Sequence, residues 1–236
     1  MDENKKKGFP TWAIALLVVL GVVVVGCPLL SIVAAIAIPS LLRSRIAANE
    51  SSAVGTMRSL VTTQSHWRQT DADRNGVSDY WTADVSGFYR IERAPGQGPV
   101  SSVDIALAQA DDDKFADGGP VAGRPGKDPK SVGAGLLALS RTAPRSGYFF
   151  RAMKLNADGE PYAADADGDG NAWTHDSEFG FQARTEKYDQ AGGGVTTFIV
   201  SEAGVIYGMD FGDSLPGNAE SWPGMNPTAS GWRVVQ

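Results

Sequence analysis

An uninterrupted apolar stretch dominates the beginning of the chain. No ionisable side chain occurs from Phe9 to Leu42, whereas a helix that rises about 1.5 Å per residue needs only about 20 apolar residues to cross a bilayer. A cleaved secretory signal would instead have an apolar core of about 7 to 15 residues followed by polar sequence. The pattern therefore predicts a transmembrane helix over residues 9–42.

The apolar positions become periodic where this stretch ends. They recur at spacings of three, four and seven residues, namely at Leu42, Ile46, Ala53, Met57, Leu60 and Val61. Such spacing places them on one face of a helix and leaves the other faces polar. We expect an amphipathic helical extension over residues 43–69.

Short segments rich in β-branched and aromatic residues follow, separated by glycine-containing turns. Six of them are expected to form strands: residues 79–85, 87–91, 147–153, 179–184, 195–200 and 205–209. Gly204 supplies the positive φ expected in a hairpin between the last two strands. Short helices are expected at residues 103–110 and 133–140. The predicted fold is α+β: a long N-terminal transmembrane helix continues into a soluble helix packed on an antiparallel β-sheet.

Charged residues assign the two ends of the chain to opposite sides of the membrane. Lys5, Lys6 and Lys7 precede the apolar stretch, so the positive-inside rule makes residues 1–8 a basic cytoplasmic leader and residues 70–236 an extracytoplasmic domain. Of 21 basic and 27 acidic residues, five basic and two acidic ones precede or directly flank the apolar stretch, which leaves the domain a net charge of about −9. No nucleic-acid partner is expected, because nucleic-acid binding needs a basic surface.

The chain has a single cysteine, Cys27, which lies inside the apolar stretch. The domain therefore has no disulfide, cysteine nucleophile or cysteine metal site. The sequence Val24-Val25-Gly26-Cys27 resembles the lipobox of bacterial lipoproteins, in which the cysteine is acylated. However, residues 28–36 are hydrophobic, where a lipoprotein normally has a polar tether. The alternative is a small hydrophobic side chain buried in lipid.

The strongest chemical signal is an acidic loop near residue 170. Oxygen-bearing side chains occupy alternate positions, and an aspartate occupies the twelfth: Asp165, Asp167, Asp169, Asn171 and Asp176. With Gly170 at the sixth position, this is the spacing by which an EF-hand-type loop surrounds calcium. Glu178 could replace Asp176 as the final, bidentate ligand.

A second acidic loop has part of the same pattern. Asp71, Asp73, Asn75 and Asp79 occupy positions one, three, five and nine, but Thr82 stands at the twelfth. Calcium bound at either loop would have a structural role. The alternative for both loops is a solvated acidic turn, because Asp and Gly are common turn residues.

Catalytic motifs are scarce along the chain. Only His66 and His175 could act as bases near neutral pH. The sequence contains no HExxH motif, phosphate-binding loop, dinucleotide fingerprint or nucleophile elbow. We expect no enzymatic activity.

Two segments around the membrane boundary resemble the N-terminal helix of type IV pilins and pseudopilins. They are residues 32–45 (IVAAIAIPSLLRSR) and 48–58 (ANESSAVGTMR). The resemblance implies a bacterial inner-membrane protein with a single span. It also implies that a prepilin peptidase cuts the basic leader between Gly8 and Phe9, and that Phe9 is then methylated. A processed chain would assemble with like or related pilin subunits into a cell-surface filament.

The chain departs from the pilin pattern near the expected cleavage site. Ala13 stands where the family has a glutamate that pairs with the N-terminal amine of a neighbouring subunit. Two functions therefore stay open. One is a membrane-anchored, pilin-like structural subunit of a type IV pilus or a type II secretion pseudopilus. The other is an unprocessed anchored module, with its domain periplasmic or extracellular, that binds a ligand or organises the envelope without forming filaments.

Overall fold

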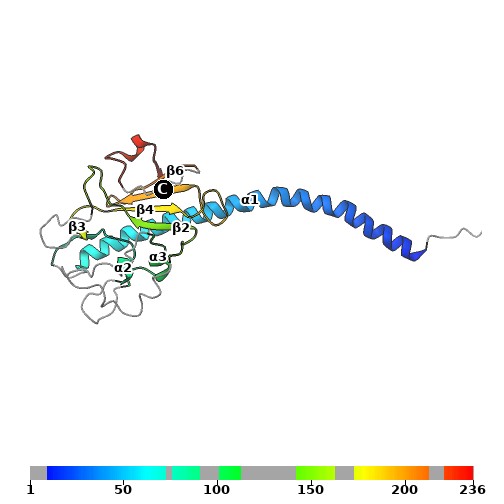
Figure 1. The fold of residues 1–236 in the computed structure, drawn as a ribbon, viewed down its shortest axis with the longest axis horizontal. Coiled ribbons are helices and arrows are strands. Elements are labelled where there is room, and N and C mark those ends of the chain that lie inside the picture. The colour runs from blue at the N-terminus through cyan, green and yellow to red at the C-terminus, as the bar shows by residue number, and fades with distance from the viewer. Residues whose placement is uncertain are drawn as a thin grey trace, which may run out of the picture. The chain divides into compact units, whose positions relative to one another are not determined.

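A computed structural model describes residues 10–72, 76–90, 101–112, 142–162, 173–212 and 221–235, leaving out the side chains of Arg90 and of residues 25–34. The chain divides into two compact units, Met1–Ser44 and Arg45–Gln236. Helix α1 runs through Thr11–Thr70, so its second half belongs to the same unit as the β-sheet (Figure 1). In the described parts of the chain, no helix has the combined length and hydropathy of a membrane span.

A five-stranded antiparallel sheet forms the centre of the second unit. Its strands lie in the order β2-β4-β5-β6-β7. Their bounds are Tyr148–Ala152 for β2, Gly180–Thr185 for β4, Thr196–Ser201 for β5, Ile206–Asp210 for β6 and Arg233–Val235 for β7. A separate two-stranded sheet pairs β1, Tyr80–Trp81, with β3, Thr174–His175. These elements confirm the α+β class and the antiparallel sheet predicted from the sequence.

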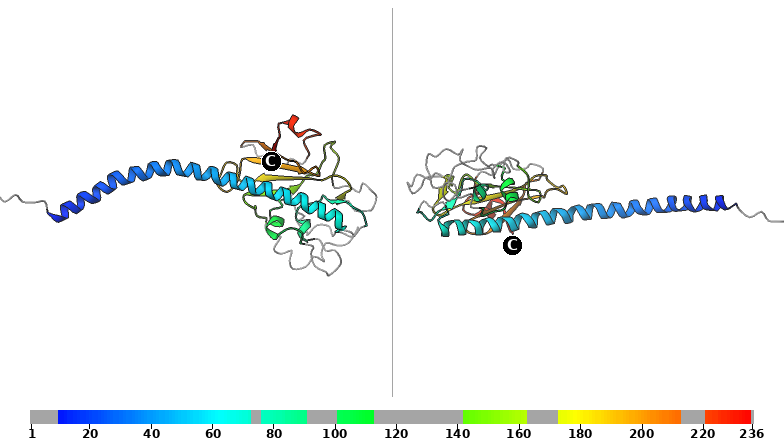
Figure 2. Two further views of the ribbon diagram at one scale, coloured as in Figure 1. Left: turned by 180° about the vertical axis from the view of Figure 1, so that it is seen from behind. Right: turned by 90° about the horizontal axis from the view of Figure 1, so that it is seen from below.

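The second half of α1 packs on one face of this sheet (Figure 2). Alternate strand residues point toward the helix, as the two-residue period of a strand requires. The buried helix residues include Ala53, Met57, Leu60 and Trp67, and the sheet contributes Tyr148, Phe150, Phe181, Ala183, Phe198, Val200 and Ile206. The apolar periodicity beyond residue 42 therefore marks the buried face of α1 correctly.

The opposite face of the sheet is covered by the C-terminal segment. A second apolar cluster joins Ile199 of the sheet to Met153, Tyr162 and Trp232. The 3-10 helix η3, Pro227–Ser230, precedes Trp232 and ends at Gly231, whose φ is 90°. Both sheet faces are therefore covered at least in part, which explains why β4 and β5 are buried at nearly every position.

Gln64 ties α1 to the small sheet. Its amide nitrogen donates to the carbonyl oxygen of Trp81 at 2.5 Å, and its amide oxygen accepts from the backbone N–H of Trp81 at 3.1 Å. Both residues are fully buried. The paired bonds reproduce the contacts that a neighbouring strand would make with β1.

One predicted strand is wrong. Gly87–Arg90 forms a helical turn, α2, where the sequence predicts a strand over residues 87–91. The side chain of Asp84 fixes this turn, because its carboxylate accepts from the backbone N–H of Gly87 at 2.8 Å and from the hydroxyl of Ser86 at 2.7 Å. These contacts cap a helical turn and override the strand preference of the aromatic residues.

The remaining expectations are met in part. Helix α3, Ile105–Gln109, lies inside the predicted helix at residues 103–110. The hairpin turn before β6 is confirmed, since Gly204 has a φ of 71° and its N–H bonds to the carbonyl of Ser201 at 2.9 Å. The helix expected at residues 133–140 lies outside the described residues.

Candidate functional site

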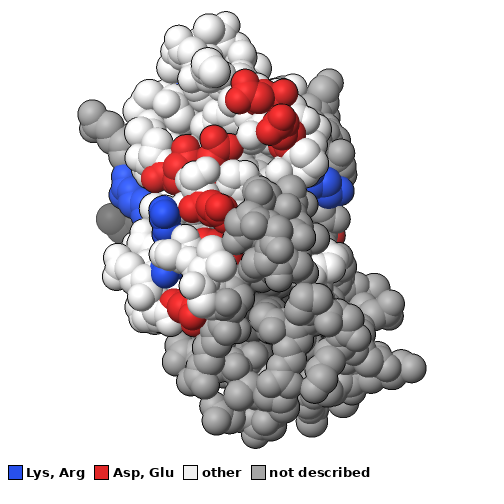
Figure 3. Space-filling model, turned by 90° about the vertical axis from the view of Figure 1, so that its left-hand side faces the viewer, with Lys and Arg blue, Asp and Glu red and all other residues white. Residues whose placement is uncertain are grey.

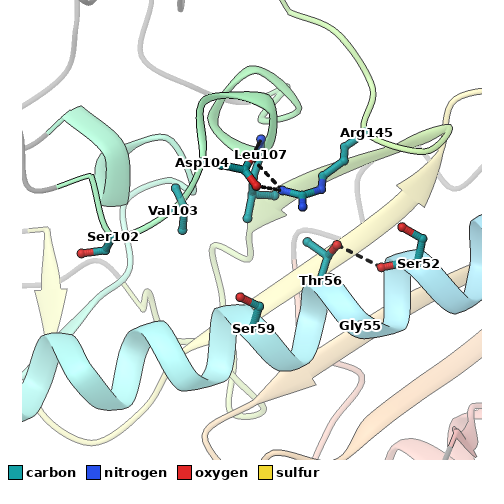
Figure 4. Close-up of a pocket in the computed structure, with 9 residues that line it drawn as sticks. All are labelled: Ser52, Gly55, Thr56, Ser59, Ser102, Val103, Asp104, Leu107 and Arg145. Atoms are coloured by element: carbon teal, nitrogen blue, oxygen red, sulfur yellow. Dashed lines mark hydrogen bonds and ion pairs between the residues drawn. The ribbon is translucent and has the colours of Figure 1, made fainter.

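A polar groove opens between α1 and the segment that carries α3. Its volume is about 350 Å³. Figure 4 shows the lining residues, which come from three separate parts of the second unit: Ser52, Gly55, Thr56 and Ser59 of α1; Ser102, Val103, Asp104 and Leu107; and Arg145. The groove is therefore assembled by the tertiary fold.

An ion pair between Asp104 and Arg145 forms one wall of the groove. The Nη1 atom of Arg145 lies 2.8 and 2.6 Å from the two carboxylate oxygens of Asp104. Asp104 is also the N-cap of α3, and its Oδ1 accepts from the backbone N–H of Leu107 at 2.8 Å. The cap fixes the carboxylate, and the carboxylate in turn positions the guanidinium.

A tight turn presents Arg145 to the groove. The backbone groups of Arg145 and Tyr148 bond to each other at 2.9 and 3.0 Å across Ser146 and Gly147. Ser146 and Gly147 have φ values of 49° and 75°, the left-handed pair found in tight hairpin turns. This turn leads directly into β2, so the sheet anchors the arginine.

Hydroxyl groups of α1 line the opposite wall. Ser52, Thr56 and Ser59 lie three or four residues apart and therefore share one helix face. The Ser52 hydroxyl bonds to that of Ser146 at 3.0 Å, and the Thr56 hydroxyl donates back to the Ser52 carbonyl at 2.9 Å. At Gly55 a Cβ atom would meet no other atom within 4 Å, so this part of the groove is open.

The chemistry of the groove suits binding. Among the described lining residues the guanidinium of Arg145 and the carboxylate of Asp104 pair with each other, so their charges cancel. The part of the lining that the structure describes includes no histidine or cysteine that could act as a base or a thiolate nucleophile. Hydroxyl and guanidinium donors beside a carboxylate can hold a polar ligand by hydrogen bonds.

The acidic loop near residue 71 is only partly described. Asp71 Oδ2 accepts from the backbone N–H of Gly76 at 3.2 Å, while its buried Oδ1 has no hydrogen-bond partner in the described part of the chain. Asp79 is buried. Asp73 and Asn75 lie outside the described residues. Within those residues, no group of three metal-ligating side chains comes together.

The acidic loop near residue 170 lies mostly outside the described residues, which do not include Asp165, Asp167, Asp169 or Asn171. Asp176, its predicted final ligand, is exposed just after β3. Glu178, the alternative final ligand, accepts a hydrogen bond from Asn156 at 2.9 Å. The calcium prediction stays open for both loops.

The structure describes both histidines. His66 is exposed on α1. The Nδ1 atom of His175 accepts from the backbone N–H groups of Ser177 and Glu178 at 3.3 and 3.0 Å, which caps the turn after β3. The predicted processing residues Gly8 and Phe9 lie outside the described residues, and so does the side chain of Cys27.

Sequence reasoning did not single out the groove residues. Asp104 carried one usable signal, because an aspartate just before a helical pattern is a common N-cap. Its pairing with Arg145 spans 41 residues of sequence, so the spacing of residues could not predict it.

The surface of the molecule carries acidic side chains. On the face in Figure 3, red acidic side chains form a band with blue basic ones at its margins.

Comparison with known proteins assigns no activity to this chain. Residues 119–235 match a family described as "Protein of unknown function (DUF2950)". The match covers just under half of the chain, includes β2 to β7 and Arg145, and leaves out α1. No curated protein and no solved structure matches the chain.

Proposed function

We propose that this protein is a membrane-anchored, pilin-like structural protein. The observation that carries the proposal is the surface of the first half of α1. Its described side chains are almost all apolar and exposed, for example Trp12 at 70%, Val22 at 66% and Ile36 at 71%. A continuous apolar surface of this kind is unfavourable in water and marks contact with lipid or protein.

The length of this apolar segment fits a bilayer. Residues 9–42 contain no ionisable side chain, and at about 1.5 Å per residue about 20 of them cover the hydrocarbon core. By the positive-inside rule, the lysines at positions 5–7 support a cytoplasmic location for residues 1–8 and a periplasmic or extracellular location for the sheet-containing unit. The proposed location is the bacterial inner membrane, with the bilayer as the first partner.

The likeness to pilins supports a structural role within a filament. Residues 32–45 and 48–58 carry the sequence resemblance, and one helix, Thr11–Thr70, includes both segments. Its second half packs on an antiparallel sheet, which is the arrangement that the resemblance implies. Like or related pilin subunits are the proposed partners after cleavage between Gly8 and Phe9.

An anchored binding module is the second candidate, and the polar groove favours it. The Asp104–Arg145 pair and the hydroxyls of Ser52 and Ser59 offer hydrogen-bonding groups on an open surface. Ala13, in the place of the pilin glutamate, also removes the charge that helps pilin subunits assemble. In this candidate the chain keeps its leader and acts as a monomer.

N-terminal mass spectrometry of the protein from native membranes tests the proposal. A mature chain that begins at methylated Phe9, recovered in sheared filaments, supports the pilin-like subunit. A chain that still carries residues 1–8 in the membrane contradicts the filament and favours the binding module. A chain that begins at acylated Cys27 contradicts both, because it would be a lipoprotein. A chain in the aqueous fraction contradicts the anchor.

A matched pair of glycine variants sharpens this experiment. Gly8→Val should block cleavage and leave the full-length chain in the membrane, because a bulky side chain would occupy the cut site. Gly21→Ala, a glycine of α1 with no atom within 4 Å of an added Cβ, should be processed as the wild type. Equal processing of the two variants would show that the cut, if any, lies elsewhere.

A further inference from the structure

A cluster of charged side chains lies on the sheet face that points away from α1. Asp112 forms a two-pronged ion pair with Arg151, with Nε–Oδ1 and Nη2–Oδ2 distances of 3.1 and 2.8 Å. The same carboxylate accepts from Nε and Nη2 of Arg184, the former at 2.6 Å. Arg151 of β2 and Arg184 of β4 come from neighbouring strands, so the antiparallel register brings them together.

The charges of this cluster do not balance. Asp112 is the only carboxylate among the described residues that pairs with either guanidinium. An arginine does not lose its proton in a protein, so among the described residues two positive charges share one negative charge. The side chains of Arg151 and Asp112 are only 6% and 8% exposed. A buried net charge is unfavourable unless an anion compensates it.

One nitrogen of the Arg184 guanidinium has no partner among the described residues, and the side chain is partly exposed. Its bonds to Asp112 engage Nε and Nη2, and Nη1 has no partner in the described part of the chain. The Arg184 side chain is 26% exposed, so solvent reaches it more readily than the other two. The ring of Phe149, the cross-strand neighbour of Arg184, lies 5.1 Å from its guanidinium carbon and fixes its plane.

Gln182 gives an independent sign that this face is not an ordinary apolar core. It lies directly opposite Arg151 in the β2–β4 register and is fully buried. Neither its amide nitrogen nor its amide oxygen has a hydrogen-bond partner among the described residues. Buried polar groups normally have partners, so an unpaired amide beside an unbalanced charge cluster indicates a missing polar ligand.

We propose that Arg184 binds a carboxylate ligand through its Nη1 edge, with Asp112 and Arg151 holding the guanidinium in place. A carboxylate matches the planar guanidinium fork. Its single negative charge balances the cluster, whereas a doubly charged phosphate would leave excess negative charge beside Asp112. The ligand is either a small organic acid or the carboxylate of a peptide. This site is separate from the groove at Arg145 and does not depend on the proposed anchor.

Isothermal titration of the full chain in detergent tests the site with three probes. They are acetate, a short alanine peptide with a free C-terminus, and the same peptide amidated, each measured against sodium chloride at equal ionic strength. Binding of acetate or of the free peptide, without binding of chloride or of the amidated peptide, supports the proposal. Tighter binding of the peptide than of acetate identifies a peptide source, and the reverse identifies a small acid. Equal heats for acetate and chloride, or no heat from either carboxylate probe, would overturn it.

Three arginine variants complete the test. Arg184→Gln should weaken carboxylate binding about tenfold or more, the effect of losing a charged hydrogen bond. Arg184→Lys keeps the positive charge beside Asp112 but lacks the planar guanidinium, so it should also lose carboxylate binding. This variant still tests the site if Arg184→Gln does not fold. Arg233→Gln, an exposed arginine on β7, is the matched control and should bind as the wild type. Equal loss in Arg233→Gln, or unchanged binding in Arg184→Lys, contradicts the site.

Discussion

A carboxylate oxygen of Glu50 lies 3.0 Å from the backbone nitrogen of Thr196 at the start of β5. The same oxygen accepts from the backbone N–H of Val195, also at 3.0 Å. Asn49, the preceding residue of α1, donates from its amide nitrogen to the carbonyl of Gly193 at 2.8 Å. Two adjacent helix residues therefore bind the loop between β4 and β5.

Removing the carboxylate should loosen this contact. Glu50→Ala leaves two part-buried N–H groups without an acceptor, and we expect it to lower the free energy of unfolding by about 1–3 kcal/mol. Glu50→Gln keeps an acceptor oxygen without the charge and should cost less. Urea unfolding of the full chain in detergent, followed by tryptophan fluorescence, measures both. Equal stability of Glu50→Ala and the wild type would show that water replaces the side chain.

Crowding beside Tyr148 makes Gly194 sensitive to substitution. A Cβ at Gly194 would lie 2.0 Å from the Tyr148 hydroxyl oxygen, which itself donates to the carbonyl of Thr196 at 2.9 Å. We expect Gly194→Ala to destabilise the domain by about 1–3 kcal/mol through overpacking. Gly192→Ala is the matched control, because a Cβ there meets no atom within 4 Å. A thermal melt in which both variants lose equal stability would contradict the steric explanation.

Buried tyrosines should make the domain less stable in alkali. Burial raises the pKa of Tyr148, and the charge of Glu50 adds to this rise while the hydrogen bond to Thr196 opposes it. Burial likewise raises the pKa of Tyr162, with further contributions from Glu202 and Glu178. Below pH about 10 these tyrosines are protonated in both states. Above that pH the unfolded chain loses protons that the folded chain retains, so stability falls as pH rises.

The contribution of a buried tyrosine can be measured by comparing how steeply the free energy of unfolding falls with pH in the wild type and in a tyrosine variant. Each buried tyrosine contributes a loss of about 1.4 kcal/mol per pH unit above pH about 10. Tyr148→Phe should reduce the alkaline slope by that amount, while costing about 0.5–1.5 kcal/mol at neutral pH through the lost hydrogen bond. Denaturant midpoints across the alkaline range provide the data. An unchanged slope in Tyr148→Phe would mean that Tyr148 ionises with similar ease in both states.

Calcium should raise the melting temperature if either acidic loop binds it. Asp71 Oδ1 is buried and has no hydrogen-bond partner among the residues that the structure describes. Gly76, the sixth residue of that loop, has the positive φ of 85° that a sharp turn requires. EDTA should lower the melting temperature and added calcium should restore it. Asp71→Asn should abolish the response if the loop near residue 71 is the site, whereas exposed Asp158→Asn should not.

The calcium experiment has two other outcomes. A response that survives Asp71→Asn assigns the ion to residues 165–176. The absence of any shift with EDTA or calcium rejects both loops. A shift with magnesium equal to that with calcium would indicate general screening of acidic side chains.

The longer strands could be predicted from the sequence because their own residues determine them. Strands β2, β4, β5 and β6 carry alternating apolar residues whose buried set faces α1. In contrast, β3 and β7 have only two and three residues, too few to show a period. Their assignment depends on hydrogen bonds to partners elsewhere in the chain. The turn at α2 depends in the same way on Asp84, whose cap overrides local strand preference.

The candidate sites were harder to predict for a related reason. Asp104 and Arg145 are ordinary surface residues by type, and only the fold places them across one groove. Arg151 and Arg184 occupy positions of β2 and β4 where alternation alone predicts solvated side chains. These side chains are partly or fully buried because both faces of the sheet are covered. No local sequence pattern indicates that covering. Acidic spacing, by contrast, is visible in sequence, yet it does not establish that a cation binds.

The contact between Gln64 and Trp81 also bears on assembly by strand addition. An open strand edge is a template on which another chain can add a strand. At Trp81 that edge is closed on one side by β3 and on the other by a helix side chain. Strand addition by another chain is therefore blocked at this residue. Helix α1 thus shields this edge of β1 from cross-chain pairing and from the aggregation that such pairing begins.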